Sequence, residues 1–152
     1  MRLSKEENNK LLNAIPLIAA YVAFADGKLN EKEVFSAKRI AGLRRFSGNF
    51  EPRIRQYYNE VFEKFDDRFS DVVSKLPNDE GERNEYLEKE LRDINTLLKK
   101  ISPLYAEQLV HTYRSFAEHV AKAEGGIMQI GAVGHKEAKA MKLSMIEDVD
   151  SI

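Results

Sequence analysis

The sequence contains no cysteine, and this absence excludes disulfide bonds, a thiolate nucleophile and cysteine-ligated zinc. Its 24 basic and 25 acidic residues nearly cancel, so no net charge directs the chain to nucleic acid or to anionic lipid. The longest apolar stretch, residues 11–25, contains Asn13 and Pro16 and is too short to span a bilayer. The first residues also lack the apolar core of a secretory signal. We therefore expect a cytoplasmic protein that neither inserts into a membrane nor binds nucleic acid.

Catalytic motifs are absent as well. The sequence has no phosphate-binding loop, no dinucleotide fingerprint and no Ser–His–Asp order. Two of its three histidines, His111 and His119, share one predicted helix but lie too far apart to hold one metal ion. These absences predict a non-enzymatic protein. A hydrolase that uses carboxylates as acid and base is the weaker alternative, because it would lack a nucleophile and a positioned histidine.

No stretch alternates between apolar and polar residues as a half-buried strand does, whereas apolar residues recur at helical spacing along most of the chain. Ser4 and Glu7 form a capping box, and Pro16 predicts a kink in the helix that follows. The expected helices cover residues 4–25, 31–45, 52–76, 79–101 and 103–123, with a last one from about 135. The length of 152 residues suits one domain, which predicts an all-α, compact bundle of about six helices over residues 1–152.

One pattern occurs twice. Residues 19–33 read AAYVAFADGKLNEKE, and residues 117–127 read AEHVAKAEGGI. In both, an apolar helix runs into an acid and a glycine, with Asp26 opposite Glu124. Gly27 is placed to end the first helix in a left-handed conformation, and Asn30 is placed to cap the next one. The repetition predicts two pseudo-repeats, each a helix, an acid–glycine loop and a second helix.

The two acids stand where a carboxylate is unfavourable. Asp26 and Glu124 follow the C-terminal ends of helices, where the helix dipole disfavours negative charge by about 0.3–1 kcal/mol. A hard cation such as Ca²⁺ or Mg²⁺, held by carboxylates and loop carbonyls, would make this placement favourable. Glu33 could reach an ion at the first corner, and Glu137 could reach one at the second. The hypothesis is a metal site formed by Asp26, Glu33, Glu124 and Glu137.

A local role for the same acids remains open. Asp26 can close an Asx turn on its own loop, and Glu33 suits the third position of a helix, where the dipole and a capping box favour an acid. An EF-hand is excluded, because counting from Asp26 puts Ala37 where the bidentate carboxylate belongs. If the acids are only structural, the protein is a protein–protein interaction module without metal. Its binding surface would then be the charged segment 79–90 or the glycine-rich segment 125–134.

The first motif, ADGKLNEKEV at residues 25–34, resembles the signature of the tellurite-resistance TerB-like domain family. The second copy and the glycine-rich segment that follows it are similar to the other half of that family, although Glu124 replaces the usual aspartate. The resemblance covers residues 11–45 and 105–145. It implies a helical module with an acidic, metal-binding surface that serves tellurite resistance or stress responses. It also implies protein partners, some of them associated with membranes.

Overall fold

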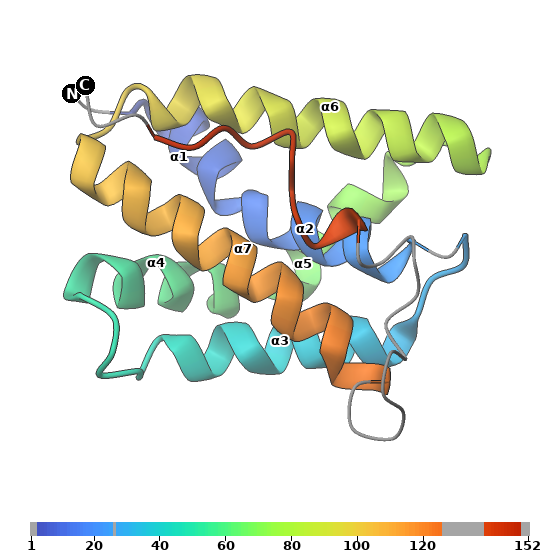
Figure 1. Ribbon diagram of the computed structural model, residues 1–152, viewed down its shortest axis with the longest axis horizontal. Coiled ribbons are helices and arrows are strands. Elements are labelled where there is room, and N and C mark those ends of the chain that lie inside the picture. Colours follow the sequence, from blue (N-terminus) through green and yellow to red (C-terminus); the bar gives the residue numbers. More distant parts are fainter. Residues whose placement is uncertain (1–2, 26, 126–138, 150–152) are drawn as a thin grey trace.

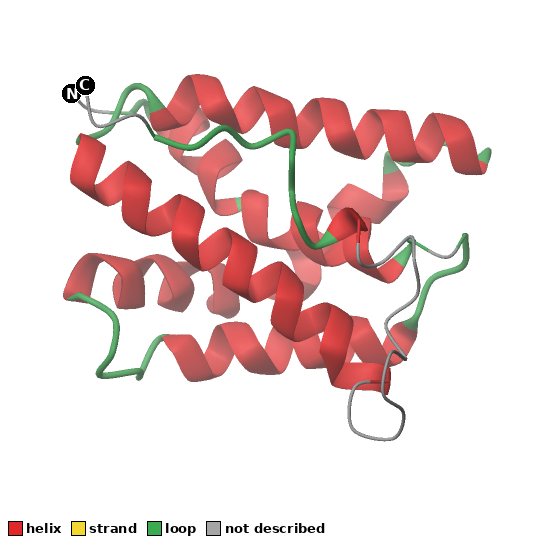
Figure 2. Ribbon diagram, in the orientation of Figure 1, coloured by secondary structure: helices red, strands yellow, loops and turns green. Residues whose placement is uncertain are grey.

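The computed structural model describes residues 3–25, 27–125 and 139–149 (Figure 1). All regular structure in these ranges is helical, which confirms the predicted all-α class (Figure 2). None of the described helices is long and apolar enough to cross a membrane. The helices are α1 (Lys5–Leu12), α2 (Ala14–Ala23), α3 (Glu31–Arg44), α4 (Pro52–Glu63), α5 (Phe65–Ser74), α6 (Glu80–Leu98) and α7 (Pro103–Gly125).

The predicted first helix is divided in two. It begins with the expected capping box, in which the backbone N–H of Glu7 donates to Ser4 Oγ (3.1 Å) and that of Ser4 donates to Glu7 Oε1 (2.9 Å). It breaks at Asn13, three residues before Pro16. Proline has no N–H for the carbonyl four residues earlier, and its ring crowds that carbonyl. The break therefore lies one turn ahead of the proline that causes it.

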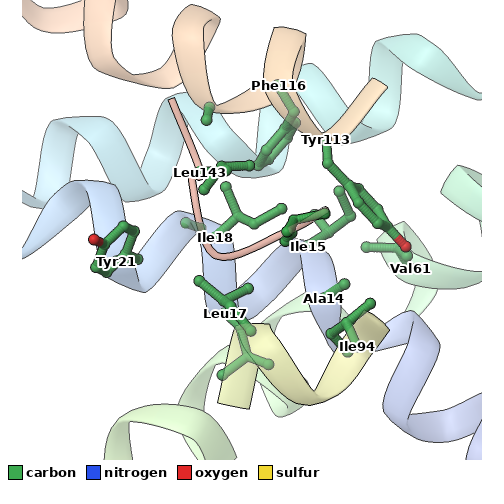
Figure 3. Close-up of a cluster of buried hydrophobic side chains, with 14 of the residues drawn as sticks. Ala14, Ile15, Leu17, Ile18, Tyr21, Val61, Ile94, Tyr113, Phe116 and Leu143 are labelled. Carbon is green, nitrogen blue, oxygen red and sulfur yellow. The ribbon is translucent and has the colours of Figure 1, made fainter. Parts of the chain in front are cut away.

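Helix α2 forms the centre of the bundle. Every residue from Ala14 to Ala23 is buried, and the helix packs against α3, α5, α6 and α7. A helix that is apolar on all sides must be enclosed on all sides, which the sequence of this segment predicts. Figure 3 shows its side chains among those of the surrounding elements. The labelled neighbours are Val61 of α4, Ile94 of α6, Tyr113 and Phe116 of α7, and Leu143.

The segment 139–149 has little helix but is firmly held. Its Leu143 and Ile146 are buried in the core. Asn95, itself buried in α6, donates through Nδ2 to the carbonyl of Met145 (2.8 Å) and accepts at Oδ1 from the backbone N–H of Glu147 (2.9 Å). Asn95 thus pairs with this backbone much as a neighbouring strand would, and it ties the segment to α6 (Figure 1).

Replacing Asn95 should release this segment. Asn95→Ala removes both hydrogen bonds and leaves the partly buried Met145 carbonyl and Glu147 N–H without this partner, which costs about 1 kcal/mol. We expect faster amide hydrogen exchange in residues 143–149 and a smaller change in α2. Asn84→Ala is the matched control, since Asn84 lies exposed on the same helix and bonds only Glu88. Equal exchange in the two variants would show that Asn95 does not hold the segment.

Candidate functional site

The corner between α2 and α3 carries the first sequence motif, and its backbone is closed by hydrogen bonds. Gly27 has a φ of +94°, which confirms the left-handed glycine predicted there, and its N–H donates to the carbonyl of Phe24 (2.8 Å). The N–H of Asn30 donates to the carbonyl of Ala23 (3.0 Å). The end of α2 and the start of α3 are therefore joined directly across the loop.

Asn30 caps α3 as expected. Its side-chain oxygen accepts from the backbone N–H groups of Lys32 (3.1 Å) and Glu33 (3.2 Å). A complete capping box would return the Glu33 carboxylate to the N–H of Asn30. That N–H bonds Ala23 instead, so the carboxylate of Glu33 is not used to close a box.

Glu33 is buried, with 1% of its surface exposed. It lies on the inner face of α3 in line with Ala37, Ala41 and Arg44. A carboxylate is rarely buried unless positive charge or hydrogen-bond donors compensate for the lost hydration. The N-terminal end of α3 supplies part of that compensation, because the helix dipole is positive there. Glu33 is thus a carboxyl group held inside the protein, in the first turn of the helix that follows the acid–glycine loop.

Helix α6 supports the same corner from outside. Arg83 donates through Nη2 to the carbonyl of Gly27 (2.9 Å), and its guanidinium lies 4.4 Å from the centre of the Phe24 ring. The carboxylate of Glu80 approaches the loop closely, so that a Cβ at residue 27 would lie 3.0 Å from it. Gly27 is therefore required by its backbone conformation, since a φ of +94° is one that residues with a Cβ rarely adopt. Sequence reasoning did not associate Arg83 or Glu80 with the corner.

A cleft of about 420 Å³ with mixed polar and apolar walls lies beside this corner. Its walls carry the acids Glu80 and Glu88 and the bases Arg83 and Lys139. The hydroxyl of Tyr21 donates to Glu88 Oε2 (2.8 Å), and burial together with this carboxylate raises the pKa of Tyr21. Charges of both signs are thus gathered at the end of α2, where a small polar ligand or a cation could approach the loop.

Only one of the four predicted metal ligands is located. Glu33 is described above. Asp26 and Glu137 lie outside the described residues, and Glu124 belongs to the last turn of α7, where its side chain is not described. Among the described side chains, no three His, Asp or Glu residues gather as a metal site would require. The four-residue metal site and the pseudo-repeat that suggested it therefore stay predictions.

A second polar centre, which the sequence did not reveal, surrounds Arg44. The segment 39–55 contains five arginines, and one of them, Arg44, is only 6% exposed. Its Nη1 donates to Tyr58 Oη (3.0 Å) and to the Thr112 carbonyl (2.9 Å). Its Nη2 donates to Ser115 Oγ (2.9 Å) and to His119 Nδ1 (3.0 Å).

Aromatic rings complete the environment of this cation. The guanidinium carbon of Arg44 lies 5.4 Å from the ring centres of Phe50 and Tyr58 and 5.6 Å from that of Phe116. The hydrogen-bonding partners of Arg44 include no carboxylate, and none of the described carboxylates forms an ion pair with it. Arg44 thus joins α3 to α4 and α7 through hydrogen bonds and cation–π contacts. These contacts therefore hold α3 against α4 and α7.

Comparison with known proteins found no relative of this chain. No family model matches the sequence, and no curated protein or solved structure is detectably similar to it. The structure defines an all-helical protein, and the resemblance to TerB-like domains remains an expectation from the motif.

Proposed function

We propose that the chain is a non-enzymatic, cytoplasmic module of the TerB-like type, which binds a divalent cation at the corner between α2 and α3 and acts through protein partners. The observation that carries this proposal is the burial of Glu33 directly behind the acid–glycine loop. Hard cations such as Ca²⁺ and Mg²⁺ prefer carboxylate and carbonyl oxygens. Asp26, which precedes Gly27 in the loop, is the second ligand that we propose.

Cation binding at this position would act on α3. The corner joins the last turn of α2 to the cap of α3 through the bond from Asn30 to Ala23. An ion between the loop and Glu33 would stiffen this connection and fix the start of α3. The exposed side of α3 could then respond to the ion, which is the behaviour expected of a stress-responsive module without catalytic activity.

Thermal unfolding of chelator-stripped protein tests the cation. A ligand at a hundred times its dissociation constant adds about 2.7 kcal/mol, which corresponds to a rise in melting temperature on the order of 5–10 °C for a domain of this size. We expect Ca²⁺, Mg²⁺ or Mn²⁺ to produce such a rise. The variant Asp26→Asn with Glu33→Gln should abolish the ion-dependent part of it.

Glu31→Gln is the matched control, because Glu31 lies in the same first turn of α3 but is exposed. The comparison uses the shift caused by the ion, so a change in the basal stability of a variant does not affect it. The variant Glu124→Gln with Glu137→Gln tests the second corner. Calorimetric titration of the wild type and of this variant would show whether the protein binds one ion or two. If none of the three ions shifts the melting temperature, the protein is better explained as an interaction module without metal.

A further inference from the structure

Helix α3 exposes large apolar side chains on its outer side. Among the described residues, four large hydrophobic side chains are exposed, and three of them belong to α3 or to the turn that ends it. Phe35 is 69% exposed, Leu43 58% and Phe46 73%, while the fourth, Leu104, lies at the start of α7. Phe35, Arg39 and Leu43 repeat at helical spacing and so form one stripe on α3, and Phe46 follows in the turn after the helix, where its N–H donates to the carbonyl of Leu43 (3.1 Å).

The charge of this stripe has one sign. Residues 34–50 include no acid and four basic residues. Of the four, Lys38 is paired with Asp66 (2.8 Å) and Arg44 is buried. The remaining two, Arg39 and Arg45, form no ion pair with any described residue. We call Phe35, Arg39, Leu43, Arg45 and Phe46 the outer face of α3.

Part of the outer face is already ordered. The guanidinium of Arg45 lies 4.6 Å from the ring centre of Phe46 and 4.1 Å from that of Phe62, and its Nε donates to the carbonyl of Gly42 (3.0 Å). Side chains that are fixed before binding lose little conformational entropy when a partner arrives. Phenylalanine and arginine are also among the residues enriched in the centres of protein interfaces.

We propose that the outer face of α3 docks an amphipathic helix of a partner protein, whose apolar stripe is flanked by Asp and Glu. The helical spacing of Phe35, Arg39 and Leu43 suits a second helix laid along α3, which runs along the edge of the bundle beside α4 and α7 (Figure 1). Arg39, which is exposed and forms no ion pair with a described residue, selects an acidic flank. This inference does not depend on the cation site. It deepens the other part of the proposed function, action through protein partners, by naming the chemistry of one partner.

Two other occupants fit the charges less well. A second copy of the chain, related by two-fold symmetry, would bring like charges of Arg39 and Arg45 together. An anionic membrane would meet the exposed acids Asp66 and Asp67, which lie next to Lys38 at the border of the same face. A partner helix can instead place each carboxylate opposite an arginine.

Binding of a synthetic peptide tests the proposal. The probe is a fluorescein-labelled amphipathic helix with a Leu/Phe stripe and Glu flanks, and the comparison probes are the same peptide with Lys flanks and phosphatidylglycerol vesicles. We expect the Glu-flanked peptide to bind the intact chain more tightly than the Lys-flanked one, with amide chemical-shift changes concentrated in residues 35–46. Leu43→Ala should weaken binding about tenfold, and Arg39→Glu should weaken it at least as much.

Matched controls come from the same chain. Leu104→Ala removes an apolar side chain that is 59% exposed, close to the 58% of Leu43, and Arg92→Glu reverses an exposed arginine on α6. Neither control should change the affinity. Equal weakening by Leu43→Ala and Leu104→Ala, the absence of binding at millimolar peptide, or stronger binding to the vesicles than to the peptide would each overturn the proposal. Circular dichroism of every variant confirms that the helices are intact.

Discussion

Above about pH 10 the protein is expected to lose stability steeply, because burial raises the pKa of the tyrosines in its core, Tyr21 among them. Tyr57, Tyr58 and Tyr113 are buried, and burial raises the pKa of each hydroxyl. The charge of Arg44 opposes this rise at Tyr58. The hydroxyls of Tyr57 and Tyr113 lie 2.9 Å apart, and that of Tyr57 donates to the carbonyl of Leu11 (2.6 Å).

The sign follows from proton counting. An unfolded tyrosine releases its proton near pH 10, whereas a buried one keeps it, so above that pH the unfolded state binds fewer protons and the free energy of unfolding falls. Each buried tyrosine contributes about 1.4 kcal/mol per pH unit, and three contribute about 4. A domain with a typical stability of about 5–15 kcal/mol should therefore unfold within a few pH units. Below about pH 10 the same tyrosines have no effect on the pH dependence.

Urea unfolding at a series of alkaline pH values measures this slope. Tyr57→Phe removes one of the ionising groups, so its slope should be smaller by one proton even though its stability at neutral pH is also lower. Tyr86→Phe is the control, since Tyr86 is only partly buried and its loss should change the slope less. A free energy of unfolding that stays constant well above pH 10 would contradict the assignment of these tyrosines to the core.

Arg44→Ala should be among the most destabilising single substitutions on α3, by about 2–4 kcal/mol. It removes donors from Tyr58, from Ser115 and from the buried carbonyl of Thr112, and it leaves a space between the aromatic rings. The gain from no longer burying a positive charge offsets part of this loss. Arg44→Met fills the same space without donors and should therefore lie between the wild type and Arg44→Ala.

Chemical denaturation of the three proteins measures the effect, with Arg39→Ala as the control. Arg39 is exposed on the same helix and forms no ion pair with the described residues, so its loss should change the stability by no more than about 0.5 kcal/mol. If Arg44→Met proves more stable than the wild type, the cost of burying the guanidinium exceeds what its hydrogen bonds and ring contacts supply. Arg44 would then serve something other than stability.

The helices could be predicted because their ends carry local signals. Ser4 with Glu7, Asn30, and Pro103 after Ser102 each mark a start through bonds or steric rules that involve only a few neighbouring residues. The division of α4 from α5 at Lys64 carries no such mark, and the sequence predicted a single helix over residues 52–76. Its position depends on packing against elements distant in the sequence.

The polar centre at Arg44 and the outer face of α3 were not predicted, because they too depend on contacts between residues distant in the sequence. The burial of Arg44 depends on acceptors from Tyr58, Thr112 and Ser115, which helical periodicity does not associate with it. Likewise, the sequence directed attention to segments 79–90 and 125–134 as partner surfaces. Residues 126–134 lie outside the described part of the chain, and among the described residues three of the four exposed large apolar side chains belong to α3 or to the turn that ends it. The absence of acids between residues 34 and 50 was the signal that could have indicated that face.

The enclosure of α2 also affects how the two halves of the sequence can diverge. Every position of α2 faces another part of the protein, so almost any change there disturbs packing. Helix α7, its counterpart in the second motif, exposes Glu107, His111 and Glu118, and these positions can change without loss of the core. If the two motifs arose by duplication, α7 kept exposed positions on which new recognition could evolve, whereas α2 kept none.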